Sequence, residues 1–74
     1  MAGLTPSFRA CGGDVLMGPT PLPFATAERL FGWYARNALE AEASGDLLGA
    51  KLFARSGVEL GEAIQETQRW RRAA

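Results

Sequence analysis

The sequence predicts an all-α protein: an antiparallel two-helix hairpin, over about 24–44 and 46–72, preceded by an irregular arm rich in proline and glycine. Three observations support this prediction. Apolar residues recur at steps of three and four through both segments, as on one face of a helix. A Ser-Gly-Asp sequence interrupts that pattern with residues that end one helix and begin another. All four prolines lie before the first of these segments.

The arm, 1–23, forms the first of two predicted units, and the hairpin, 24–74, forms the second. Proline and glycine punctuate the arm and prevent a long helix there. It also contains apolar residues that a purely flexible tail would not need: Leu4, Phe8, Val15, Leu16 and Met17. We expect an irregular segment that folds back, with at most a short extended piece at Asp14 to Met17. A disordered leader is the alternative.

The first helix is expected to begin between Pro23 and Thr26, since proline suits a first helical turn and threonine can cap free amides. Gly45 can adopt the left-handed conformation that often ends a helix. The apolar positions of this helix form one stripe: Ala27, Leu30, Phe31, Tyr34, Ala38 and Ala41.

The second helix is expected to begin with Asp46 as its cap. So short a link requires antiparallel neighbours. The apolar stripe of this helix consists of Ala50, Phe53, Ala54, Gly57, Leu60, Gly61 and Ile64. The opposite face is charged and therefore solvated: Lys51, Arg55, Glu59, Glu62, Glu66 and Arg69.

A close helix–helix seam is predicted by four small residues of the second helix: Ala50, Ala54, Gly57 and Gly61. Glycine within a helix costs about 1 kcal/mol relative to alanine, so two glycines in register indicate tight packing. Counting outward from the turn places Tyr34 opposite Gly57 and Leu30 opposite Gly61. Large side chains would thus meet small ones across the seam.

The pattern around the turn resembles a single tetratricopeptide-type helix pair. The residues that carry the resemblance are Tyr34, Ala38 and Ala41, then Gly45-Asp46 at the turn, then Ala50 and Gly57. The chain lacks the closing proline and a second copy of the unit, and such repeats need about three units for stability. We interpret the resemblance as a shared packing solution and not as kinship.

The composition argues against catalysis and against a bound cofactor or metal. The chain has no histidine and one cysteine, Cys11, so a zinc site, a cysteine–histidine mechanism and an internal disulfide are all excluded. We therefore predict that the protein is not an enzyme and has no catalytic, cofactor-binding or metal-binding residues. Cys11 is expected to be an inert thiol, with a redox or covalent role as the alternative.

Apolar side chains outside the seam predict an interaction surface, because a two-helix hairpin cannot bury two sides. The residues concerned are Trp33, Leu39, Leu48, Leu52, Val58, Ala63 and Trp70. We expect a small protein–protein interaction module: an accessory subunit, adaptor or inhibitor that acts by surface occupation. It would work as a homodimer, for example a four-helix bundle, or bound to a larger partner.

The basic tail is a second candidate surface: Arg69, Trp70, Arg71 and Arg72. Arginines beside an aromatic ring can bind phosphates while the ring stacks on a base, so a nucleic-acid-binding protein is the alternative function. The same residues could grip an acidic protein groove, or simply complement the helix dipole. Eight acidic residues balance eight basic ones, so the chain has no net charge that would attract nucleic acid.

We also expect the chain before the first helix to cross the end of the second. Leu22 or Phe24 would pack against Trp70 and leave the three arginines of the tail free for a partner.

No apolar run approaches the ~20 residues of a membrane span, and the first residues lack the apolar stretch of a secretory signal. Together with the lone cysteine, this predicts a cytoplasmic protein without a membrane partner.

Overall fold

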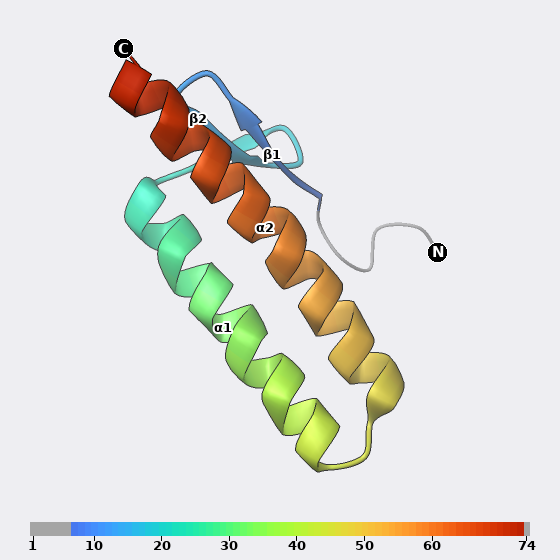
Figure 1. Ribbon diagram of the computed structural model, residues 1–74. Coiled ribbons are helices and arrows are strands. Elements are labelled where there is room, and N and C mark those ends of the chain that lie inside the picture. The colour runs from blue at the N-terminus through green and yellow to red at the C-terminus, as the bar shows by residue number, and fades with distance from the viewer. Residues whose placement is uncertain (1–6, 74) are drawn as a thin grey trace.

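The computed structural model describes residues 7–73 and shows a three-stranded antiparallel sheet followed by two helices (Figure 1). The elements are β1 (Phe8–Cys11), β2 (Asp14–Met17), β3 (Thr20–Leu22), α1 (Phe24–Ala43) and α2 (Leu47–Ala73). This is an α+β layout, so the all-α prediction is wrong. The predicted hairpin is present, and its helices begin and end within one residue of the expected positions. The error lies in the arm.

Two tight turns build the sheet from the arm. Gly12-Gly13 joins β1 to β2, and Gly18-Pro19 joins β2 to β3. Gly12 has a φ of 61° and Gly18 a φ of 60°. A positive φ at the first central residue is typical of a two-residue hairpin turn with glycine in that place. The glycines of the arm therefore direct strand pairing, where we had expected irregular chain.

β1 and β3 are too short, and β3 too interrupted by proline, to be recognised as strands from their residues. The expected extended piece at Asp14 to Met17 is confirmed as β2, the central strand. β3 contains Pro21, which is compatible with a sheet only because β3 is an edge strand. The arm residues Leu4 and Pro6 lie outside the described part of the chain.

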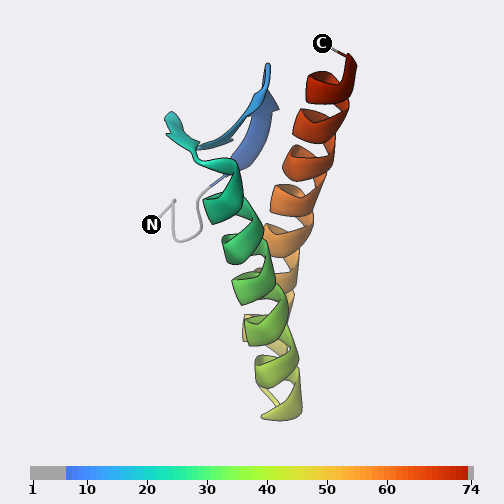
Figure 2. The ribbon, with the colours of Figure 1, turned by 90° about the vertical axis from the view of Figure 1, so that its left-hand side faces the viewer.

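One face of the sheet packs on the helices. The register pairs Phe8 with Met17, and it pairs Val15 with Ala10 and Leu22, so these five side chains share a face. Phe8 is 4% exposed and Val15 only 1%. In Figure 2 the two helices diverge away from their connecting turn, and the sheet lies against one side of their open end.

The turn between the helices has the predicted structure. Gly45 has a φ of 85°, in the left-handed region. Asp46 caps α2, because its Oδ1 accepts a hydrogen bond from the Gly49 amide at 2.9 Å. Both expectations are confirmed.

Helix α1 begins without a side-chain cap. Its first backbone hydrogen bond runs from the Ala27 amide to the Pro23 carbonyl at 3.0 Å. Thr26 lies inside the first turn and does not cap the helix, contrary to expectation.

The core is shared between sheet and hairpin. Its buried members are Phe8, Val15, Ala27, Tyr34, Leu60 and Ala63, the last of which was expected on the surface. Gly57 lies opposite Tyr34 as predicted, since a Cβ on Gly57 would stand 3.3 Å from the Tyr34 Cβ. Gly61 faces Phe31 and not Leu30; a Cβ there would stand 2.9 Å from Phe31 Cε1.

The molecule is long and thin. α2 has 27 residues and is therefore about 40 Å long. The dimensions are 44 × 26 × 15 Å. The radius of gyration is 13.1 Å, against ~11 Å for a compact domain of this length.

We predict that Gly57→Leu destabilises the fold by about 1–3 kcal/mol, because the new side chain must displace Tyr34. Ala54→Leu is the matched control, since Ala54 lies on the same helix but is exposed; its effect should stay within about 0.5 kcal/mol. Urea denaturation followed by circular dichroism measures both. Equal stabilities for the two variants would contradict this placement of the seam.

Tyr34 is the single tyrosine of the chain and gives the core a pH dependence. Burial raises the pKa of its hydroxyl above the ordinary 10.0, and the Ser56 hydroxyl lowers this pKa in part. A raised pKa in the folded state stabilises the fold below pH 10.0, and this stabilisation is lost as the pH rises through the folded-state pKa.

We therefore expect Tyr34→Phe to lose less stability than the wild type on going from neutral to alkaline pH. Tyrosinate absorbance reports the titration, and denaturant melts at each pH report the stability. Parallel stability curves for the two proteins would refute a contribution from Tyr34.

Candidate interaction surface

Large apolar side chains remain exposed on the hairpin, most of them in the half nearest the turn. The residues concerned are Phe31, Trp33, Leu39, Leu47, Leu48, Leu52, Val58 and Trp70. All but Trp70 lie between residues 31 and 58, and Leu39, Leu47 and Leu48 are 67–69% exposed. The predicted interface residues Leu39, Leu48 and Leu52 are thus on the surface.

The reach of the sheet determines which part of the hairpin stays uncovered. The Phe8 ring packs edge-on against Tyr34, with 5.9 Å between ring centroids. The Phe8 amide donates a hydrogen bond of 2.8 Å to Glu59 Oε1. Phe8 opens β1, so these contacts mark where the sheet ends along both helices. Beyond these contacts, and among residues 7–73, α1 and α2 pack only against each other.

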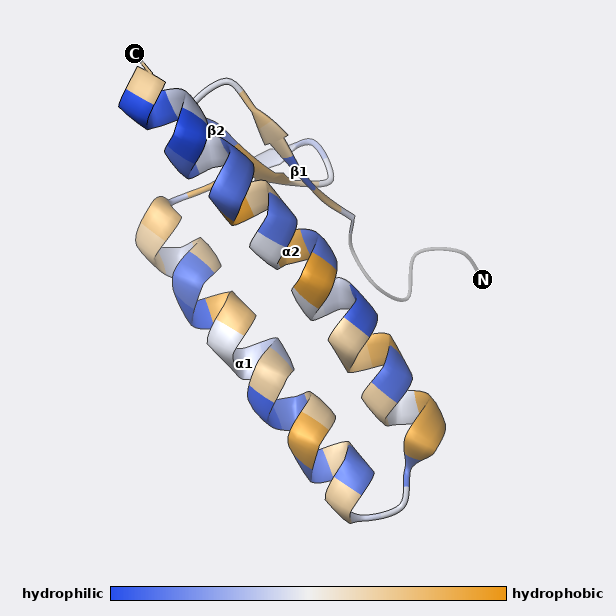
Figure 3. Cartoon of the chain, viewed as in Figure 1, coloured by the Kyte–Doolittle hydropathy of each residue, from blue (hydrophilic) through white to orange (hydrophobic). Residues whose placement is uncertain are grey.

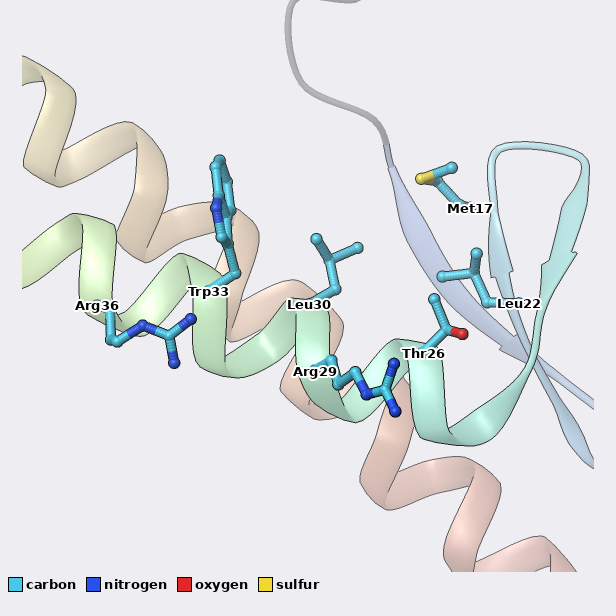
Figure 4. A pocket seen from close by; sticks show the side chains of 7 residues that line it. All are labelled: Met17, Leu22, Thr26, Arg29, Leu30, Trp33 and Arg36. Carbon is cyan, nitrogen blue, oxygen red and sulfur yellow. The ribbon is translucent and has the colours of Figure 1, made fainter.

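A groove of about 670 Å³ runs beside the sheet along α1 (Figure 4). Its apolar lining comes from Met17, Leu22, Leu30 and Trp33, and its polar lining from Thr26, Arg29 and Arg36. In Figure 4 Leu30 and Trp33 project from α1 on the side of the sheet, while both arginines lie along the flank of the helix. The two charges that line this groove are positive.

Trp33 is the aromatic residue at the end of this groove. Its indole packs edge-to-face against Tyr34 and Phe53, with centroid separations of 5.2 and 5.6 Å. It remains 45% exposed. An indole held in place on one side and open on the other loses little freedom when a partner covers it, as is typical of the residues that dominate binding energy.

The face of the hairpin turned away from the sheet carries a second, smaller groove of about 230 Å³. It is lined by Phe31, Ala35, Ala38, Phe53, Ala54, Gly57 and Val58. In Figure 3 hydrophobic and hydrophilic segments alternate along both helices, and the first turn of α2 is hydrophobic. The predicted seam residue Ala54 is exposed and Ala50 is half-buried, so they line the margin of the helix interface.

The tail is partly engaged within the protein. Arg71 Nε donates a 2.9 Å hydrogen bond to the Gly13 carbonyl, and its guanidinium carbon lies 4.9 Å from the centroid of the Phe24 ring. Trp70 covers Gly13, where a Cβ would stand 3.2 Å from the indole. Arg69 pairs with Glu66 at 2.9 Å.

The arm therefore does cross the end of α2, but through the β1–β2 turn. Trp70 packs on Gly13, where we expected Leu22 or Phe24, and it stays 53% exposed. Arg71 was expected to be free and is not. Arg72 is exposed.

Of the seven residues that line the larger groove, Trp33 alone was predicted as an interface residue; the other six are Met17, Leu22, Thr26, Arg29, Leu30 and Arg36. Leu22 comes from β3, which we did not predict, and Met17 from β2, which we expected as an extended piece but not as part of a sheet. The arginines stand seven residues apart on α1, a helical spacing that places them on one side. This spacing is the sequence signal that could have identified the two arginines as part of one surface.

The described residues show no metal site and no membrane span. Within 7–73 no three histidine, cysteine, aspartate or glutamate side chains gather as metal ligands would. None of the helices in that range combines the length and hydropathy needed to cross a bilayer. Cys11 is exposed and is a free thiol.

No protein-family model, curated protein or solved structure matches this chain. The case for a function therefore rests on the geometry and chemistry of the surfaces described above.

We predict that Arg71→Ala loosens the β1–β2 turn, because it removes a charged donor from the Gly13 carbonyl. Hydrogen–deuterium exchange should quicken at Gly12 to Asp14, by about tenfold for a contact worth roughly 1.5 kcal/mol. Arg72→Ala is the matched control and should leave exchange in the turn unchanged. Unaltered exchange in Arg71→Ala would mean that Trp70 and the Thr67 hydroxyl hold the turn without Arg71.

Proposed function

We propose that the protein is a small, non-catalytic protein–protein interaction module: an accessory subunit, adaptor or inhibitor that acts by occupying a surface. The observation that carries the proposal is the exposure of large apolar side chains in the half of the hairpin beyond the sheet. Five large apolar side chains are at least 43% exposed there: Leu39, Leu47, Leu48, Leu52 and Val58. Monomeric proteins rarely expose apolar side chains so densely, and extended apolar patches mark interaction sites.

The groove beside the sheet supports the same proposal. An anchored aromatic residue, Trp33, stands beside an apolar floor, and arginines and a threonine form the rim. Protein interfaces commonly combine an aromatic centre with a polar border. The 74-residue chain also has a small core, and domains below roughly 70–80 residues are often stabilised by association.

Catalysis and nucleic-acid binding are less well supported. The chain has no histidine to act as a base near neutral pH. In the basic tail the charge of Arg69 is offset by Glu66, and the Arg71 side chain is held against the Gly13 carbonyl by a hydrogen bond. We place the protein in the cytoplasm, since an exposed lone cysteine suits a reducing compartment.

The test is affinity capture from the native cell with mass spectrometry, using wild-type protein beside two variants. Leu48→Lys changes an apolar side chain that is 69% exposed, whereas Arg55→Glu changes a charged, exposed position of the same helix. We expect a stoichiometric protein that Leu48→Lys loses and Arg55→Glu retains. Recovery that is equal with all three baits would count against this surface. Salt-dependent binding of short oligonucleotides, abolished by Arg72→Ala, would instead favour nucleic-acid binding.

A further inference from the structure

We infer that the groove along α1 receives α1 of a second copy of this chain, in an antiparallel pair related by a two-fold axis. The inference rests on the proposed function and names the partner and the contact at one of its surfaces. It starts from a stripe of α1 that the protein leaves exposed: Thr26, Arg29, Trp33, Arg36 and Glu40.

These five residues follow one another at alternating steps of three and four, so they share one side of the helix. Residues seven apart drift by only about 20° around a straight helix. The first four of them line the groove beside the sheet. Glu40 continues the stripe beyond the groove, toward the turn. The stripe is therefore basic in its middle and acidic at its turn end.

Consider a two-fold axis that is perpendicular to α1 and passes beside it at the level between Tyr34 and Ala35. This axis would make the stripe complementary to itself. Antiparallel pairing about that axis places Arg29 of each copy opposite Glu40 of the other. It also places Trp33 of each copy opposite Arg36 of the other, a cation–π arrangement. Every contact occurs twice because the interface is isologous.

The charges concerned are unsatisfied within one copy. Among residues 7–73 the sole ion pair is that of Arg69 with Glu66, so Arg29, Arg36 and Glu40 take part in none. Arg29 and Glu40 are eleven residues apart, or about 16 Å along one helix, which is too far for a direct pair. Arg29 and Glu40 can therefore meet only between copies.

The shape of the protein favours the same arrangement. Each sheet covers the open half of its own hairpin and leaves the turn half uncovered (Figure 2). In the antiparallel pair the turn half of one α1 lies beside the sheet of the other copy. There the apolar floor formed by Met17, Leu22 and Leu30 receives it.

An acidic helix from a different protein is the other occupant with suitable chemistry for Arg29 and Arg36. It would pair with both arginines, but Glu40 in the same stripe would repel it. A stripe that carries both signs, in a chain of zero net charge, fits a second copy better.

The test is a charge exchange followed by sedimentation velocity over a range of concentrations. Arg29→Glu alone brings a second carboxylate against Glu40 of the other copy, and Glu40→Arg alone brings two cations together. Each variant alone should dimerise more weakly by roughly tenfold or more. Mixed in equal amounts they should form a heterodimer, because the two single variants then restore an attractive pair. The double variant should dimerise like the wild type.

Glu62→Arg is the matched control, since it reverses an exposed charge on α2 and should leave dimerisation unchanged. Circular dichroism is used to check that each variant is folded. Wild-type protein that is monomeric throughout, a double variant that fails to associate, or equal weakening by Glu62→Arg would each overturn the inference. If the dimer is absent while Leu48→Lys still loses a captured protein, the inference fails and the proposed function stands.

Discussion

The burial of one sheet face against the open end of the hairpin is the contact on which the rest of the structure depends. Two helices alone share a seam and enclose no interior. Phe8 and Val15 supply the missing layer, and Leu60, the largest fully buried side chain, lies in the same core cluster. Full burial of a leucine or valine stabilises by about 1.5–3 kcal/mol, a large fraction of the stability of so small a domain.

Polar contacts from α2 fix the position of the sheet on this core. At one end of β1, Glu59 accepts a hydrogen bond from the Phe8 amide. This bond also satisfies an amide that has no partner strand, since β1 is an edge strand. Thr67 donates to the Asp14 carbonyl at 3.3 Å, and Arg71 donates to the Gly13 carbonyl at the other end. These side chains recur along one edge of α2, so the helix sets the position of the strands as well as covering them.

The helices could be predicted because their signals are local. Gly45 and Asp46 determine the turn by their own conformations, and the periodic apolar residues determine the two helices. The sheet could not be predicted in the same way. Its strands have three or four residues, too few to show an alternating pattern, and one contains Pro21. What stabilises them is burial on α2, more than 40 residues away in the chain, as the Phe8–Glu59 contact shows.

The candidate surface was predicted in part for the same reason. Leu39, Leu48 and Leu52 were identified because the hairpin seam has no place for them, and they are exposed. Arg71 was assigned to the surface because the Gly13 carbonyl that binds it belongs to a turn whose position was unknown. The groove was missed because two of the three residues of its floor, Met17 and Leu22, come from the sheet. Local patterns thus locate exposed side chains, whereas a concave site requires the tertiary arrangement.

The uncovered surface follows from the lengths of the elements. A strand of four residues spans only about 13 Å, whereas α2, with its 27 residues, spans about 40 Å. A sheet of such strands can therefore cover only part of the hairpin, whatever the sequence of the remainder. Polar residues over that remainder would have made it an inert, solvated extension. Leucines that are 67–69% exposed occupy it instead. The short sheet that completes the core thus also leaves these apolar side chains exposed.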